Sequence, residues 1–181
     1  MRRYRILKNL IASIIMLATP MIVIPTANAS ELDDPTIFAI FDEVNTVDIW
    51  TARLAARKGH SDEVRALGRQ VASDHEAVQQ MARDLAKKLG VVPAPPANDE
   101  MAQDHAKTVA MLQAKSGRAF DRAYLQHESK FHASAIETVK NTLLPALKNE
   151  KFKALILKVA PGFESHLAMT TALAKKLGYS K

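Results

Sequence analysis

The feature that most constrains this chain is its helical periodicity. Over four long segments after residue 34, apolar residues return every three or four positions, which places them on one face of an α-helix. No stretch alternates apolar and polar residues over a β-branched run, as a half-buried strand would. We therefore expect an all-α fold in which four amphipathic helices bury their apolar faces against one another.

Capping residues and glycines divide the periodic region into helices. The expected helices span residues 35–58, 62–89, 99–115, 118–143 and 150–177. A proline-rich connector, residues 91–98, precedes the short third helix, which Asn98 or Asp99 caps. Pro161 and Gly162 should kink or interrupt the last helix. Four long helices with one short crossover helix predict a single domain, residues 30–181, built as an up-and-down four-helix bundle.

The first 29 residues have the three-part pattern of a secretory signal peptide. Residues 1–8 carry four basic side chains and no acid, residues 10–24 are almost wholly apolar, and Ala27-Asn28-Ala29 precedes Ser30. An uncleaved anchor is the alternative, but the apolar run is broken by prolines and is shorter than the roughly 20 residues of a membrane span. We expect cleavage before Ser30 and a periplasmic or secreted mature protein. The paired arginines leave both general and twin-arginine export open.

Composition excludes several classes of function. The leader contains four of the 25 basic residues and none of the 19 acidic ones, so residues 30–181 have a net charge of +2, against +6 for the whole chain. Without a dense basic patch, nucleic acid binding is not expected. The chain has no cysteine, which excludes disulfides and thiolate chemistry, and it has no Gly-x-Ser-x-Gly elbow. No later segment has the apolar length of a membrane span.

Ionisable residues interrupt the apolar face of every long helix near its middle. At about 100° per residue, five residues fall within these faces: Asp48, His75, Glu128, His132 and His166. Asn45 and Asp74 lie beside them and are expected to support them. Counted from the turns, Asn45 is level with His75 and Glu128 with His166. Asp48 and His132 each miss that level by about one turn, roughly 6 Å at 1.5 Å per residue.

A charge left unpaired in such a core costs several kcal/mol, so these groups need compensation. Imidazoles and carboxylates from facing helices suit one transition-metal ion, which could be zinc, iron or copper. We expect a non-enzymatic protein that binds this ion for storage, buffering or stress protection. The alternative is a metal-free structural or interaction protein, in which a buried hydrogen-bond network fixes the register of the helices. A metal-dependent enzyme would also need an open coordination position and a substrate cleft.

Three further residues lie away from the apolar faces. His127 points roughly 140° from the centre of its face, and so toward a flank or water. Trp50 and Phe131 are also off the main faces, and we expect them to pack against the crossover helix rather than to form an exposed partner-binding surface.

Short motifs in this order resemble a known family. They are Asn45-x-x-Asp48, Asp74-His75, residues 120–124 followed by His132, and Pro161 with His166-Leu167. Together they resemble a ferritin-like family of exported bacterial proteins, catalogued as a domain of unknown function and often labelled "predicted outer membrane protein". The resemblance covers roughly residues 37–177. It implies a ferritin-like helical bundle and a place in the cell envelope, and it implies no established reaction.

The pattern differs from that of ferritin-like di-iron proteins. Those take a glutamate from each of two helices and Glu-x-x-His from each of the other two. In this sequence no glutamate has a histidine three residues later, and Glu128 and His132 are four residues apart. We therefore expect a single ion and no ferroxidase or oxygenase centre.

Overall fold

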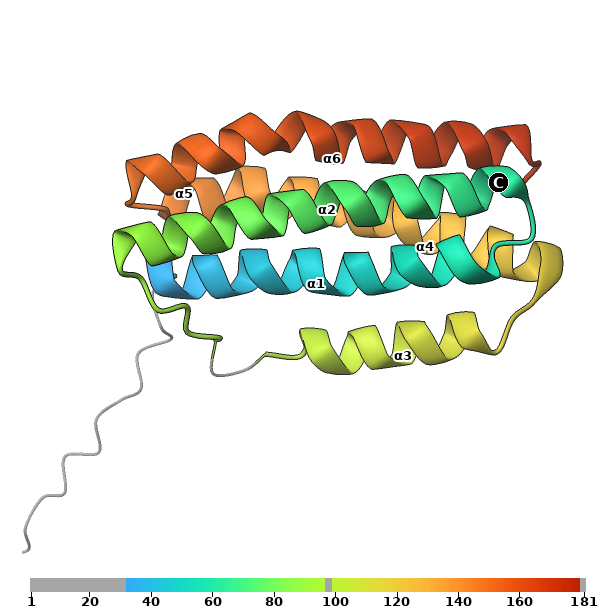
Figure 1. The fold of residues 1–181 in the computed structure, drawn as a ribbon, viewed down its shortest axis with the longest axis horizontal. Helices are drawn as coiled ribbons and strands as arrows, with labels where there is room; N and C mark the ends of the chain where they lie inside the picture. The colour runs from blue at the N-terminus through green and yellow to red at the C-terminus, as the bar shows by residue number, and fades with distance from the viewer. Residues whose placement is uncertain (1–31, 97–98, 180–181) are drawn as a thin grey trace, which may run out of the picture.

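The computed structural model describes residues 32–96 and 99–179 (Figure 1). The expected leader, residues 1–29, the expected mature start at Ser30 and the possible cap Asn98 lie outside the described residues. Every regular element in the described ranges is helical, which confirms the all-α prediction. The elements are α1 (Asp34–Lys58), α2 (Asp62–Leu89), α3 (Met101–Gln113), α4 (Gly117–Thr138), the π-helix η1 (Val139–Leu143), α5 (Leu144–Ala146) and α6 (Glu150–Lys176).

Side-chain caps explain where the long helices begin. Asp33 accepts a hydrogen bond from the Thr36 N–H at 2.9 Å, and the Ser61 hydroxyl accepts one from the Val64 N–H at 3.2 Å. Asn149 caps α6 in the same way. These side chains satisfy amide hydrogens that have no partner within their own helix. The observed starts of α1, α2 and α6 therefore agree with the predicted ones to within one residue.

The four long helices α1, α2, α4 and α6 lie side by side, with α3 along one side of them (Figure 1). The helices α1 and α2 form one antiparallel pair, and α4 and α6 form another. The connector after Gly90 and α3 carry the chain back along the length of the molecule, so α2 and α4 run in the same direction (Figure 1). The long helices therefore do not alternate strictly, as an up-and-down order would require. The long crossover between the second and the third accounts for the difference.

The helices α1 and α2 approach each other closely at Gly68. A Cβ atom there would lie 2.6 Å from the Ala52 carbonyl oxygen and 2.6 Å from the Ala56 amide nitrogen. Ala55 and Ala72 are buried at the same crossing. Only glycine lets the two backbones come this close, so Gly68 has a packing role and does not mark a helix end.

The third long helix ends in a wider turn than expected. The regular α4 changes at Val139 into η1, where the Leu144 N–H donates to the Val139 carbonyl five residues back. Pro145 supplies the physical reason. In a regular helix its ring would clash with the carbonyl four residues back, and a wider turn relieves that clash. The prediction of one uninterrupted α-helix over residues 118–143 is wrong in its last turn.

Pro161 does not interrupt α6, which is continuous from Glu150 to Lys176. Figure 1 shows the axis of α6 bending near its middle. Pro161 has no N–H, so the Leu157 carbonyl lacks its usual helical partner. Leu157 is 55% exposed, and water can take the place of that partner. The expected kink is thus present as a bend, without a break.

A polar layer divides the apolar core into two clusters. One cluster surrounds Phe41, and the other surrounds Ala52 and Tyr124. In α1, for example, the buried Asn45 and Asp48 lie between Phe41 and Ala52. Within the described ranges, none of the helices has both the length and the apolar character needed to cross a membrane.

The side chains expected on the flanks of the helices have different environments. Phe131 and His127 line a small cavity together with Met101 and His105 of α3, so both face the crossover helix. Trp50 is 54% exposed, so more than half of its surface faces solvent. The expectation that Trp50 packs against the crossover helix is therefore wrong.

Candidate metal centre

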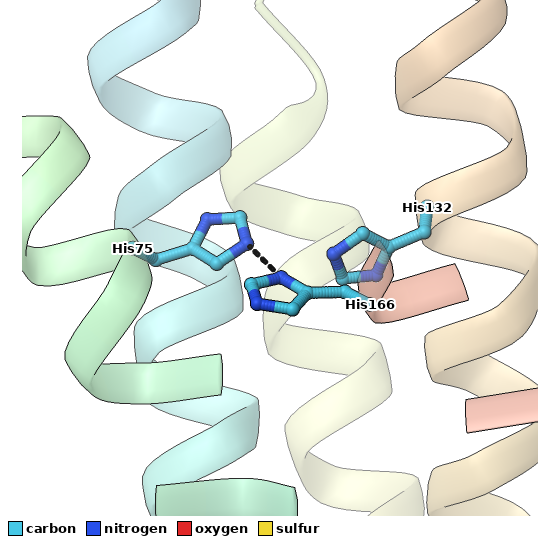
Figure 2. Close-up of side chains that lie close together, drawn as sticks. All are labelled: His75, His132 and His166. Carbon is cyan, nitrogen blue, oxygen red and sulfur yellow. Dashed lines mark hydrogen bonds between the residues drawn. The ribbon is translucent and has the colours of Figure 1, made fainter. Parts of the chain in front are cut away.

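A buried polar layer joins the middles of the four long helices. It contains Asp48 from α1, His75 from α2, Glu128 and His132 from α4, and His166 from α6, each at most 3% exposed. Figure 2 shows the three imidazoles pointing toward one another from three different helices. The structure thus brings together all five residues that the sequence singles out.

Four donor atoms in this layer lie close together. His75 Nε2 is 3.0 Å from Asp48 Oδ2 and 3.3 Å from His166 Nδ1. His132 Nε2 is 3.5 Å from the same Asp48 oxygen. Tetrahedral ligands at about 2.0–2.1 Å from a zinc ion are about 3.3 Å from one another. These separations match the spacing that one tetrahedral ion requires.

The outer nitrogens of two imidazoles are bound to groups that only accept hydrogen bonds. His166 Nε2 is 2.9 Å from Asp74 Oδ2, and His132 Nδ1 is 3.2 Å from the backbone carbonyl of Glu128. A carboxylate and a carbonyl cannot donate, so the outer nitrogen of each ring carries the hydrogen. The inner nitrogen of each ring, His166 Nδ1 or His132 Nε2, is then left with a free lone pair.

Asn45 holds the third imidazole in the same way. Its side-chain Nδ2 donates to the Phe41 carbonyl at 2.7 Å, which turns its Oδ1 toward His75. His75 Nδ1 lies 3.0 Å from that Oδ1 and donates to it. The inner atom of this ring is therefore Nε2. Each of the three histidines thus has a fixed outward N–H and an inward lone pair.

Glu128 places its carboxyl group behind His132. Its Oε1 lies 3.5 Å from His132 Nδ1. Both oxygens of Glu128 and both of Asp48 are buried without a well-aligned hydrogen-bond donor among the described residues. Asp48, Glu128 and His132 form one possible metal-binding set and His75, His132 and His166 another, and the donor atoms of each set lie within 4.8 Å of one another. Buried oxygens without donors are groups that a cation can satisfy.

Burial also decides which protons these groups carry. Burial raises the pKa of Glu128 well above its usual value, and the charge of Asp48 adds to the effect. Burial lowers the pKa of His132 to about 4, against the opposing field of Asp48. Burial alone would raise the pKa of Asp48, but contact with His75 and the nearby imidazoles lower it overall. At neutral pH the layer thus presents a neutral His132 and an ionised Asp48, the forms that bind transition metals.

The lean of the side chains brings offset residues together. The sequence places Asp48 and His132 about one turn from the level of their partners, yet the atoms lie within 3.5 Å. Helical side chains tilt toward the N-terminus of their own helix, so side chains on antiparallel helices lean in opposite directions. Asp48 and His75 lean toward each other across α1 and α2, and His132 and His166 do so across α4 and α6.

Two buried hydroxyl groups of this layer are absent from the sequence prediction. The Tyr124 hydroxyl and Thr170 Oγ1 are buried and have no hydrogen-bond partner among the described residues. Tyr124 lies one turn before Glu128, and Thr170 lies one turn after His166. That spacing puts each hydroxyl on the same helix face as a site residue, and it is the signal that could have revealed both.

Asp121 has a structural role that the sequence does not reveal. Its carboxylate is buried and accepts hydrogen bonds from the His60 N–H at 2.7 Å and the Ser61 N–H at 2.9 Å. This contact ties α4 to the start of α2. No local pattern predicts it, because the partners are about 60 residues apart.

Comparison with known proteins identifies a family and no function. A family model described as "Domain of unknown function (DUF4142)" matches residues 23–173. The matched range contains every residue of the polar layer. No curated protein and no solved structure matches the chain.

Proposed function

The chain belongs to the DUF4142 family, a domain of unknown function, and we propose that it is an exported, ferritin-like four-helix bundle that binds one transition-metal ion. Four long helices with one crossover between the second and the third support the ferritin-like assignment. The N-terminal sequence supports export to the periplasm or beyond after cleavage before Ser30.

The proposed ligands are His75, His132, His166 and Asp48, with Glu128 as a further ligand or as the group that orients His132. Three imidazoles and one carboxylate suit zinc, iron or copper. Asn45 and Asp74 orient the rings from outside. Outer partners of this kind fix the ring orientation and raise the basicity of the ligand.

One observation carries the proposal. Each imidazole holds an outward N–H against an acceptor, so three lone pairs and a carboxylate face one another at 3.0–3.5 Å. Such groups repel one another unless a positive charge lies between them. A metal ion supplies that charge and binds all four atoms. We propose storage, buffering or protection of the envelope against metal stress as the role, without catalysis.

The metal content of untagged mature protein, residues 30–181, tests the proposal. Purified under metal-replete conditions, it should contain about one ion per chain by mass spectrometry. The double variant His132→Ala, His166→Ala should lose this ion. The double variant His105→Ala, His127→Ala is the matched control, because it removes two half-buried histidines outside the layer, and it should keep the ion. Absence of metal from the wild type, or equal metal in both double variants, would refute the proposal.

A metal-free envelope protein with a structural or interaction role is the second candidate function. The 3.0 Å separation of His75 Nε2 and Asp48 Oδ2 favours it, because a proton on His75 could bridge the two groups as an ion pair. In that case the melting temperature should be the same with and without chelator. Metal binding instead predicts a lower melting temperature after chelation.

A further inference from the structure

An apolar pocket lies beside the polar layer. Its volume is about 160 Å³, and α1, α4 and η1 provide most of its wall. Three aromatic rings line it, those of Phe41, Phe131 and Phe163. The imidazoles of His75 and His132 form part of the same wall. The pocket is therefore distinct from the space among the inner donor atoms, yet it shares two side chains with it.

The chemistry of the wall excludes charged ligands and disfavours water. No Asp, Glu, Lys or Arg lines the pocket. The Nδ1 atoms of His75 and His132 are already bound to Asn45 and to the Glu128 carbonyl, and their Nε2 atoms face the polar layer. The imidazoles therefore offer no free polar atom to the pocket. A buried water needs two to four polar partners, and a charge without partners is strongly disfavoured there.

The size of the pocket indicates the size of its ligand. An engineered apolar cavity of about 150 Å³ in another protein stays dry and binds benzene. The pocket here has a similar volume, about 160 Å³. Ring edges and faces at its wall favour an aromatic guest, because aromatic pairs gain energy beyond simple burial.

A route into the pocket is visible at its rim. Ser134 and Thr138 of α4 line it and are exposed, whereas Phe41, Phe163 and the two imidazoles are buried. The π-helical turn η1 supplies Val139 and Leu143 to the wall. Such turns occur often at functional sites, and this one reshapes the wall next to the imidazoles.

From these observations we propose that the pocket binds a small neutral aromatic molecule, about the size of benzene, against His75 and His132. The proposal goes beyond metal binding and does not depend on it, because the pocket wall exists without an ion. A ligand bound there contacts two of the proposed metal ligands directly.

Benzene is the probe, added to mature protein with labelled methyl groups, in metal-free and zinc-loaded form. NMR should show saturable ring-current shifts for the methyl groups of Val44 and Val139, which line the pocket. Val71, which belongs to the other apolar cluster, should not shift. Equal shifts at Val71, or none at Val44 and Val139, would overturn the proposal without any variant.

A pair of variants adds a test of location. Ala135→Phe places a ring in the pocket and should abolish the benzene shifts. Ala133→Phe makes the same change at an exposed position two residues away and should leave them unchanged. Unchanged benzene binding by folded Ala135→Phe protein would contradict the proposal. Metal content, measured on the same samples, separates the two ideas: metal without benzene binding removes the pocket alone, and benzene binding without metal removes the metal centre alone.

Discussion

Asp74 is the most accessible residue in the shell around the three imidazoles. Its side chain is 43% exposed, and it accepts hydrogen bonds from His166 at 2.9 Å and from Gln70 at 2.8 Å. Because it sits at the edge of the layer, it can be changed without opening a cavity in the core. It therefore offers a clean way to disturb one proposed ligand from outside.

We expect Asp74→Ala to weaken metal affinity about 10–100-fold while the protein stays folded, because His166 loses the group that fixes its ring. Competition with a chelator of known affinity measures the change. The matched control is Asp84→Ala, which removes an exposed carboxylate that Gln80 binds at 2.9 Å, in the way that Gln70 binds Asp74. Equal affinities in the two variants would contradict an orienting role for Asp74.

The lowered pKa of His132 predicts acid sensitivity of the metal-free protein. Its pKa is about 4 in the folded state and 6.5 as a model value, so the unfolded chain binds a proton that the folded chain excludes. This contribution to stability is fully present above pH 6.5 and is lost as the pH falls toward 4. It amounts to about 3 kcal/mol at most.

Denaturant titrations in chelator at several pH values between 7 and 4 measure this loss. His132→Asn should show a shallower fall in unfolding free energy than the wild type over that range. Burial also lowers the pKa of His127, so its His127→Ala variant shows how much a second histidine contributes. Identical pH profiles for the wild type and His132→Asn would exclude His132 as the source.

Residue identities at the centre follow from helical periodicity, but their atomic roles do not. Periodicity places Asp48, His75, His132 and His166 on buried faces. Which ring nitrogen faces inward depends on partners in the fold, such as the Glu128 carbonyl behind His132. That choice depends on the rotamer and tertiary contacts of each ring, which one sequence does not specify.

At the scale of secondary-structure elements, the crossing of α1 and α2 depends on the absence of a side chain. A Cβ on Gly68 would lie 2.6 Å from backbone atoms of Ala52 and Ala56, which cannot move away as a flexible side chain could. Gly162 in α6 is the opposite case, since a Cβ there would have no neighbour within 4 Å.

We therefore expect Gly68→Ala to destabilise the protein by about 1–3 kcal/mol, despite the better helix propensity of alanine. Gly162→Ala should stabilise it by up to about 1 kcal/mol, because only the propensity changes. Urea unfolding of both variants provides the measurement. Stabilisation in both would show that the helices can separate at Gly68 at no cost.

Asp121 connects two elements through a buried cap. Asp121→Ala leaves the His60 and Ser61 amides without their acceptor, and we expect a loss of about 3 kcal/mol. Asp104→Ala, an exposed carboxylate on α3, should change stability little. Hydrogen exchange at the start of α2 should rise only in the Asp121 variant. Unchanged exchange there would argue against the cap.

Helix limits were predictable because their signals are local. Asp33, Ser61 and Asn149 cap within three residues, and the glycine ends are equally near. The π-helical turn before Pro145 was not predictable, because a proline can also be accommodated by a break or a bend. α6 shows the other outcome, a bend at Pro161 without a change of helix type.

At the scale of the whole molecule, the polar layer takes side chains from all four long helices. If one ion binds there, it ties α1, α2, α4 and α6 together at mid-length. Chelation should then raise hydrogen exchange in the middle of all four helices and leave α3 nearly unchanged, as mass spectrometry of peptides can report. A rise confined to α3 or to the helix ends would contradict a shared centre.

The sequence predicted four long helices and their common polar layer, and it left their directions open. Periodicity defines a buried face on each helix but carries no information about which helices are neighbours. The crossover through α3 makes α2 and α4 parallel, a consequence of where the connector after Gly90 lies in the fold. Exposed Trp50 shows the same limit, because only the path of α3 decides whether that ring is covered.

Burial of the whole layer has a consequence in time. An ion among side chains that are at most 3% exposed can leave only when neighbouring helices part locally. Its residence would then follow the frequency of that opening and not the strength of the coordination bonds alone. Slow release of this kind suits a reservoir that retains its ion, whereas a buffer has to exchange ions rapidly with its surroundings.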